Sequence, residues 1–362
     1  MPRAVVMRGA GERVVVGDFD RPTLQCGAVL LETIYSDVCG TDCHLFHGRL
    51  AGVPYPIIPG HVSVGRIAEM NGEVHDVDGR RFEIGDVVTF LDVHETCGQC
   101  WFCLVAKATT RCPKRRVYGI TYSADEGLLG GWSEAIYLKP GVKILRLPEN
   151  VSPQTFISGG CGLPTAFHAV DRATLRMGDT VVVQGSGPVG LCAVALARLA
   201  GAGHVTIVGA PDQRLDLAVE FGADEAVSIE RTTPEERVER VRGLTGGRGA
   251  DVCIEASGSP AAVVEGMELT RDNGTYVIVG QYTDCGSVQI NPHVHINRKH
   301  LDIRGCWGSD FSHVYRALIM MSRSVGTVPW EKMITRHYTL DEAGQALEDV
   351  ERLRVVKAVI EP

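Results

Sequence analysis

The chain has 362 residues, a formal net charge of −8 and 44% hydrophobic residues, a balance typical of a globular protein with two domains. Its acidic charge and its lack of a basic run argue against nucleic acid or an anionic membrane as the main partner. The sequence shows no apolar run of membrane-spanning length and no signal-peptide core, so we expect a cytoplasmic protein.

The N-terminal third reads as β structure rich in turns. Residues 4–35 alternate like the strands of an antiparallel region and are punctuated by glycines and prolines. Residues 65–70 and 86–91 continue this pattern on either side of a polar, hairpin-like insertion at 71–84. We therefore expect a mostly β first third, in contrast to the middle of the chain.

Three residues of this chain are candidate ligands of a catalytic metal: Cys39, His61 and Cys161. Two thiolates and an imidazole are ligands that zinc takes, and three protein ligands leave a fourth position open for chemistry. Spacing alone does not show that they converge, and an ordinary buried thiol is an equally good interpretation of Cys39. The nearby Thr41 and His44 favour the ligand role.

A second group of cysteines lies within one short loop. Its members are Cys97, Cys100, Cys103 and Cys112. Four thiolates at such short spacing predict a closed tetrahedral zinc site that supports folding rather than chemistry. The chain has 12 cysteines, and disulfides are unexpected in a cytoplasmic protein. Free reduced thiols and a redox Cys-x-x-Cys pair are the alternatives.

The stretch 180–210 predicts a dinucleotide-binding unit. A β-branched run at 181–184 reads as a buried strand, residues 191–200 as a helix and residues 205–208 as a second strand. Between strand and helix, Gly185, Gly187 and Gly190 have the spacing Gly-x-Gly-x-x-Gly. Such a turn lets a pyrophosphate approach the backbone at the helix N-terminus.

The end of the second strand lacks the acidic residue that hydrogen-bonds the adenosine ribose of NAD in such units. That position falls near Gly209, and Arg214 follows shortly after. The missing carboxylate and the arginine favour NADP. NAD stays open, because Asp212 could bind the ribose instead and the arginine could cover the adenine.

Alternating strands and helices continue to residue 307 and predict a parallel sheet. We expect Val279 and Gly280 to end a strand on the cofactor side, and Ser309 to follow the last strand of this sheet. The tail then predicts helices at 312–322 and 340–353 and a strand at 355–360. A histidine group at 293–300 lies in a predicted loop without an acidic neighbour, so we interpret it as surface.

Four motifs together carry a resemblance that spans essentially the whole chain. They are Cys-Gly-Thr-Asp at 39–42, Gly-His at 60–61, the cysteine loop at 97–112 and Gly-Ser-Gly-Pro-Val-Gly at 185–190. The sequence resembles the zinc-dependent medium-chain alcohol dehydrogenases, which include alcohol, polyol and threonine dehydrogenases. The resemblance implies an α/β protein. A GroES-like, mostly β catalytic domain would span 1–162 and 306–362, and a Rossmann domain with a doubly wound parallel sheet would span 163–305.

The resemblance also implies roles for single residues. Cys39, His61 and Cys161 would hold the catalytic zinc and the four-cysteine loop the structural zinc, giving two zinc ions per chain. Thr41 would contact the substrate oxygen, and His44 would be the outer histidine of a proton relay. The residues expected to bind NAD or NADP are Thr165, Gly185, Gly187, Pro188, Val189, Gly190, Gly209, Arg214, Val279, Gly280, Ser309 and Lys357.

The implied activity is hydride transfer between NAD(P) and an alcohol or carbonyl. Phe46, Leu50 and Trp307 would line an apolar pocket for a secondary alcohol, although the Cys-Gly-Thr-Asp motif equally suits a polar polyol or amino acid. Val62 replaces the glutamate usual after the ligand histidine and either alters the zinc or merely fills space. The resemblance also favours a homodimer or homotetramer. The alternative functions are a zinc-free quinone or enoyl reductase of the same fold and a non-catalytic nucleotide-binding protein.

Overall fold

The computed structural model describes residues 1–362 and contains two compact units. The first unit comprises Met1–Cys161, Asp310–Ser322 and Glu331–Pro362, and the second comprises Gly162–Ser309 and Arg323–Trp330. The predicted domain bounds stay a prediction. They differ from the units in assigning 162, 306–309 and 323–330 to the N-terminal domain.

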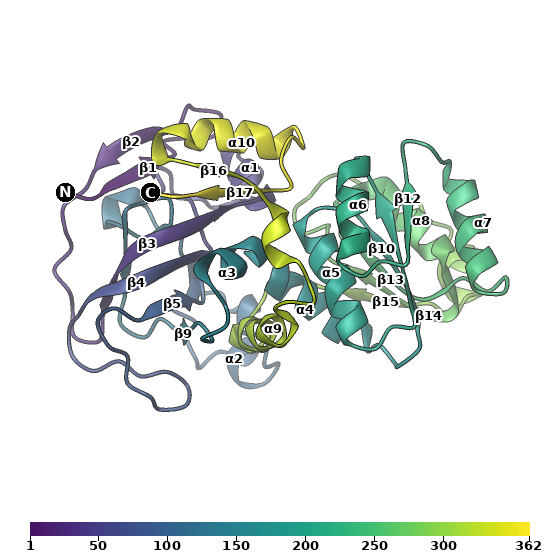
Figure 1. The fold of residues 1–362 in the computed structure, drawn as a ribbon, viewed down its shortest axis with the longest axis horizontal. Helices are drawn as coiled ribbons and strands as arrows, with labels where there is room; N and C mark the ends of the chain where they lie inside the picture. Colours follow the sequence, from purple (N-terminus) through teal and green to yellow (C-terminus); the bar gives the residue numbers. More distant parts are fainter. The chain divides into compact units, whose positions relative to one another are not determined.

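The first unit is built on a seven-stranded sheet, which Figure 1 shows in purple, blue and yellow. In spatial order its strands are β16 (Ile334–Tyr338), β17 (Lys357–Ile360), β3 (Val29–Val38), β4 (Ser63–Met70), β5 (Val87–Phe90) and β9 (Ile144–Arg146), with β8 (Ala135–Leu138) beside β3. The strands β1 (Arg3–Val6) with β2 (Val15–Asp18), and β6 (Val93–His94) with β7 (Arg116–Val117), form two separate ribbons.

The strand β3 organises this sheet. It pairs antiparallel with β4, β8 and β17, and its residues Val29, Leu30 and Leu31 are buried in the core. The expected strands of the first third and the return of the C-terminal tail to this sheet are confirmed.

The helices of the first unit are short and lie between its strands or in the tail. They are α1 (Gly40–Phe46), α2 (Trp101–Leu104), α3 (Pro153–Gly159), most of α9 (Phe311–Ser324) and α10 (Ala343–Glu351). Single turns of tighter helix are η1 (Thr109–Arg111), η2 (Ala124–Glu126), η4 (Trp330–Met333) and η5 (Leu340–Glu342). The expected helix at 340–353 is thus divided between η5 and α10.

The second unit contains a six-stranded parallel sheet, drawn in teal and green in Figure 1. Its spatial order is β12 (Glu225–Ser228), β11 (His204–Gly209), β10 (Thr180–Gln184), β13 (Ala250–Glu255), β14 (Thr270–Ile278) and β15 (Asp302–Gly305). Its helices are α4 (Gly162–Ala173), α5 (Pro188–Leu199), α6 (Asp212–Glu220), α7 (Pro234–Leu244) and α8 (Pro260–Leu269), with a π-helical turn η3 (His293–Asn297).

The strand order explains where a ligand can bind in this sheet. The chain runs from β10 outward to β12 and then returns to β13 on the other side of β10. In such a doubly wound sheet, the carboxyl ends of the two strands at the reversal leave a crevice for a ligand. The helix α5 packs with α4 and α6, and α7 packs with α8 (Figure 1). The expected parallel sheet is confirmed.

The strand β14 begins at Thr270 and ends at Ile278, so Val279 and Gly280, which were expected to end a strand, lie just beyond it. Thr270 pairs with Ala250, and a register shift before the pair Val252 and Thr275 accommodates the intervening turn. Among the helices of the structure, none is both long and apolar enough to be a membrane span.

Candidate functional site

Cys39, His61 and Cys161 converge in the first unit. Cys39 directly follows β3, and His61 lies two residues before β4. The pairing of Ser36 with Ser63 brings these two ligands to one end of the strand pair. Cys161 follows α3, and the metal-ligating atoms of the three residues all lie within 4.8 Å of one another. The convergence that spacing alone left open is therefore present.

The electrostatics of this cluster suit a cation. Burial lowers the pKa of His61, but the Cys39 thiolate and the Asp42 and Asp92 carboxylates raise it to about 10. A hydrogen bond from the Cys161 thiol and the nearby His61 hold the pKa of Cys39 well below its ordinary value despite burial. A thiolate next to an imidazolium takes up a metal by releasing protons. The donor set fits zinc, which when bound supplies Lewis-acid polarisation of a substrate oxygen.

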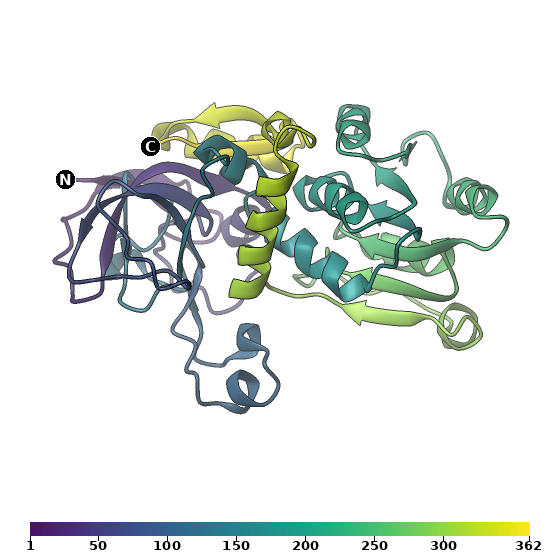
Figure 2. The same cartoon turned by 60° about the horizontal axis from the view of Figure 1, so that its bottom comes forward.

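The four cysteines of the loop form a second cluster. The Sγ atoms of Cys112 and Cys97 are 3.6 Å apart, and Cys100 lies 3.5 Å from Cys103 and 4.0 Å from Cys112. A zinc tetrahedron with Zn–S bonds of about 2.3 Å has edges of about 3.8 Å, so these separations fit the ion. The backbone N–H of Gln99 helps to lower the pKa of Cys97 to about 6. Figure 2 shows that the loop at 97–112, called the cysteine lobe below, projects from the sheet of the first unit.

Thr41 and His44 lie together on α1, for which Cys39 is the N-cap. Their spacing of three residues places them on neighbouring positions of one helix face. Burial lowers the pKa of His44, Arg49 and His47 lower it further, and Cys39 opposes them. A lowered pKa keeps the imidazole neutral near pH 7, as a proton acceptor requires.

Each glycine of the dinucleotide turn has its own steric reason. Gly185 has φ of +107°, and a Cβ there would lie 2.7 Å from the carbonyl oxygen of Ala256. A Cβ on Gly190 would lie 1.8 Å from the carbonyl oxygen of Gly185. At Gly187, the N-cap of α5, a Cβ would meet nothing within 4 Å. The space before the free N–H groups of α5 is therefore open, as a pyrophosphate site needs.

The end of β11 offers no free carboxylate. A Cβ on Gly209 would already lie 2.7 Å from Ser186 Oγ, so Ser186 crowds any side chain at that position. Asp212 begins α6, and its carboxylate pairs with Arg231 at 2.6 Å. Arg214 is buried, and burial lowers its pKa.

Glu255, at the end of β13, is a residue that sequence reasoning missed. The backbone N–H groups of Val279 and Gly280 both donate to its carbonyl oxygen at 2.9 Å. Its buried carboxylate accepts from the N–H groups of Ser257, at 2.8 Å, and Gly258, at 2.7 Å. Only the carbonyl groups of Val279 and Gly280 are therefore available to a nicotinamide amide. An acidic residue at the last position of a largely apolar strand was the available signal.

The remaining predicted contacts are divided between the units. Phe46 and Leu50 pack against the buried cluster of Leu45, Ile57 and Trp132 in the first unit. Trp307 belongs to the second unit, where its Nε1–H donates to the carbonyl oxygen of Tyr282 at 3.0 Å. Thr165 on α4 and Ser309 also belong to the second unit. Their roles stay predictions.

Lys357, predicted to bind the cofactor pyrophosphate, lies at the start of β17. Its side chain is buried, and Nζ lies 2.7 Å from Oδ1 of Asp37. The ammonium group is thus paired with a carboxylate of its own unit, and its contact with a cofactor phosphate stays a prediction.

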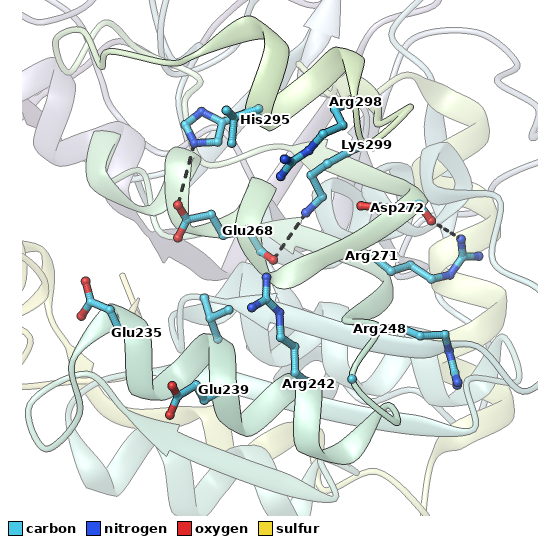
Figure 3. A pocket seen from close by; sticks show the side chains of 13 residues that line it. Glu235, Glu239, Arg242, Arg248, Glu268, Arg271, Asp272, His295, Arg298 and Lys299 are labelled. Carbon is cyan, nitrogen blue, oxygen red and sulfur yellow. Dashed lines mark hydrogen bonds and ion pairs between the residues drawn. The ribbon is translucent and has the colours of Figure 1, made fainter.

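Figure 3 shows a concavity of about 840 Å³ on the second unit. Five basic and four acidic side chains line it, namely Arg242, Arg248, Arg271, Arg298 and Lys299, and Glu235, Glu239, Glu268 and Asp272. None of these belongs to the predicted cofactor site. His295 Nε2 lies 3.8 Å from Glu268 Oε1, so the expectation that this histidine group lacks an acidic neighbour is wrong.

Two family models match the chain. The alcohol dehydrogenase GroES-like domain matches residues 25–149, and the zinc-binding dehydrogenase model matches residues 188–323. A 5-exo-hydroxycamphor dehydrogenase of Pseudomonas putida is 34% identical over 92% of both chains. The crystal structure of an alcohol dehydrogenase from Thermotoga maritima has a TM-score of 0.95 and 35% identity, covering 100% of this chain and 99% of that one.

A putative zinc-binding dehydrogenase from Sinorhizobium meliloti, solved with NADP, has a TM-score of 0.86 and 28% identity, covering 100% of this chain and 99% of that one. The protein is thus a zinc-dependent oxidoreductase that uses NAD(P) to act on alcohols, with a catalytic zinc site at Cys39, His61 and Cys161 and a structural zinc site in the cysteine loop. On its matching domains, metal sites and relatives, the chain belongs to the zinc-binding medium-chain alcohol dehydrogenase superfamily.

Proposed function

We propose that this enzyme oxidises a ring-bearing secondary alcohol to its ketone, with Thr41 and His44 carrying the hydroxyl proton to solvent. The observation that supports the relay is the helix α1, which begins directly at the ligand Cys39 and holds both residues one turn apart. Thr41 would receive the proton from the substrate hydroxyl and pass it toward His44. His44 is neutral near pH 7 because burial lowers its pKa, and it is only partly buried, so it can release the proton to water.

The proposed substrate class follows from the apolar residues and from one relative. Phe46, Leu50 and Trp307 offer aromatic and aliphatic surface, which favours a hydrocarbon ring over a polyol. The relative named for 5-exo-hydroxycamphor acts on a hydroxyl group carried by a ring carbon.

The cofactor contacts are proposed for the turn 185–190 and for Thr165, Gly209, Arg214 and Ser309, together with the carbonyl groups of Val279 and Gly280. We propose a preference for NADP. The carboxylate of Asp212 is engaged by Arg231, so no free negative charge near the end of β11 would repel a 2′-phosphate.

We further propose that the chain forms a cytoplasmic homo-oligomer. None of its 12 cysteines forms a disulfide, as a reducing compartment favours. Trp101 and Val105 are 62% and 63% exposed on the cysteine lobe, beside the exposed Phe102 and Leu104. Apolar side chains gathered in this way are typical of an interface. Light scattering should show a smaller assembly for Trp101→Ser.

The relay is tested with Thr41→Val and His44→Gln, each assayed only after its zinc content matches the parent. We expect kcat to fall about 10²–10⁴-fold in Thr41→Val and by less in His44→Gln, because water can replace the outer group. The matched control is His75→Gln, which replaces an exposed histidine of the first unit. A kcat within twofold of the parent in Thr41→Val would contradict the relay.

The substrate class is tested by comparing cyclic secondary alcohols with linear polyols and primary alcohols of equal carbon number. We expect the cyclic alcohols to have the highest kcat/KM with NADP. A higher kcat/KM for the polyols would contradict the proposed class and leave the dehydrogenase activity intact.

A further inference from the structure

A buried ion pair lies beside the catalytic zinc ligands. Lys357 Nζ on β17 is 2.7 Å from Asp37 Oδ1 on β3, and the two side chains are 1% and 0% exposed. The pairing of β17 with β3 brings them together, since Val359 lies opposite Asp37 and Ala358 opposite Val38. Burying two charges is costly, and apolar residues of similar volume often serve stability equally well. The presence of a charged pair here instead of apolar residues therefore points to a role other than stability.

The second carboxylate oxygen of this pair contacts a zinc ligand. Asp37 Oδ2 accepts a hydrogen bond of 3.0 Å from the backbone N–H of Cys161. The preceding residue, Gly160, has φ of +45°, and a Cβ there would lie 2.2 Å from Asp37 Oδ2 and 2.4 Å from Lys357 Nζ. The backbone at Gly160 therefore lies against the ion pair, directly before the zinc ligand Cys161.

Asp37 is also linked to the other two ligands. It stands two residues before Cys39 on the same stretch of chain, and its backbone N–H donates to the carbonyl oxygen of Val62, next to His61, at 3.0 Å. One residue thus connects the segments of all three ligands. A different carboxylate, that of Asp42, accepts the N–H of Cys39 at 2.9 Å. Each of the two thiol ligands therefore has its backbone held by a buried carboxylate.

We propose that Asp37 and Lys357 are positioning residues for the catalytic zinc: Asp37 fixes Cys161 in the ligand geometry, and Lys357 orients and neutralises that carboxylate. Cys39 and His61 are placed by the β3–β4 pairing, but Cys161 lies outside that pairing. Its ligand geometry therefore depends on the bond from Asp37. Groups that orient metal ligands are typically worth about 10–100-fold in metal affinity. The inference rests on the catalytic zinc assigned above.

The decisive variant is Asp37→Leu/Lys357→Met, which removes both charges and the hydrogen-bond acceptor together. Replacing a buried ion pair by apolar residues avoids the isolated charge that a single substitution leaves behind. Zinc affinity is measured on the full chain by competition with a chromogenic chelator, and the ligand geometry by the absorption bands of the Co²⁺-substituted protein. The structural zinc in the same chain serves as the internal reference.

We expect the double variant to bind the catalytic zinc about 10–100-fold more weakly, with shifted Co²⁺ bands and unchanged structural zinc. Asp37→Asn/Lys357→Met keeps an acceptor for the Cys161 N–H, so its affinity should lie between those of the parent and the apolar variant. The matched control is Arg237→Met/Glu265→Leu, which replaces the buried ion pair of the second unit. It should leave both zinc sites as in the parent.

Catalytic zinc affinity within twofold of the parent in Asp37→Leu/Lys357→Met would overturn the inference. An equal weakening of both zinc sites would also overturn it, because that would show a general effect on folding. A parent chain that holds zinc only at the cysteine loop would instead overturn the catalytic assignment and the inference with it. The zinc content of the parent chain therefore distinguishes a failure of the inference from a failure of the catalytic zinc assignment.

Discussion

Tyr338 donates a hydrogen bond of 2.7 Å to Oδ2 of Asp349. The phenol belongs to β16 and the carboxylate to α10, where Asp349 is only 3% exposed. The same carboxylate accepts bonds from Gln345 at 2.9 Å, Arg354 at 3.1 Å and Arg336 at 3.2 Å. This network anchors the last helix to the sheet that carries the zinc ligands.

We expect Asp349→Ala to lower the free energy of unfolding by about 3 kcal/mol, because it leaves a buried phenol and two guanidinium groups without their acceptor. Urea unfolding measures the change. Asp341→Asn is the control, since Asp341 belongs to the neighbouring η5 and its side chain is 71% exposed. Equal unfolding midpoints for Asp349→Ala and the parent would show that the network contributes nothing.

The contribution of Asp349 should depend on pH. The hydrogen bond from Tyr338 lowers the pKa of Asp349, against burial and with help from Arg354 and Gln345. A lowered folded pKa stabilises the fold fully above the unfolded value of about 3.9 and progressively less as pH falls through the folded pKa. The gap in unfolding free energy between the parent and Asp349→Asn should therefore be constant from about pH 6 to 8 and shrink below about pH 4. A gap that widens on acidification would contradict this assignment.

Removing one cysteine ligand from the cysteine lobe should release the structural zinc and make that lobe more mobile. We expect Cys112→Ser to retain one zinc per chain and to become sensitive to protease near residues 97–115, because the lobe has little other core. Cys161→Ala is the matched variant, which should also retain one zinc but resist the protease. Atomic absorption and limited proteolysis give the two readouts. Loss of both metals in Cys112→Ser would show that the two sites depend on each other.

The pH dependence of oxidation should report on the surroundings of His44. Burial is the main cause of its lowered pKa, and Arg49 and His47 add to it. Arg49→Gln removes one positive charge, so the pKa of His44 should rise toward its ordinary value and the acid limb of kcat/KM should move to higher pH. Arg66→Gln, an equal charge change elsewhere in the first unit, should leave the limb in place. An unmoved limb in Arg49→Gln would exclude His44 as the titrating group.

Replacing Asp212 should change the preference of the enzyme between NADP and NAD. Asp212→Asn removes a negative charge near the end of β11 and frees the guanidinium of Arg231, which now pairs with it at 2.6 Å. We expect the ratio of kcat/KM for NADP to that for NAD to rise about 5- to 10-fold, because a freed guanidinium favours a phosphate. Asp302→Asn, on the outermost strand of the same sheet, is the control. An unchanged ratio would place the adenosine ribose away from this pair.

Local patterns in the sequence predicted much of the second unit. Val181, Val182 and Val183 form a β-branched apolar run typical of a buried strand, and all three are completely buried in β10. The dinucleotide turn could also be predicted from the sequence, because neighbouring backbone leaves no room for a side chain at Gly185 or Gly190. The start of β14 at Thr270 could not be predicted in this way, because the register shift in this strand depends on its partner strand.

The sequence by itself determined the chemistry of this protein: which thiols and imidazole can bind zinc, which turn can bind a dinucleotide, and which segments form a parallel sheet. These follow from side-chain type and short spacing, which do not depend on the rest of the chain. Only the tertiary structure decided which distant residues meet. It placed Cys161 beside Asp37, 124 positions away, buried Lys357 against the same carboxylate and turned the N–H groups of Val279 and Gly280 toward Glu255. Such partners are set by the order and register of strands, which many segments determine together.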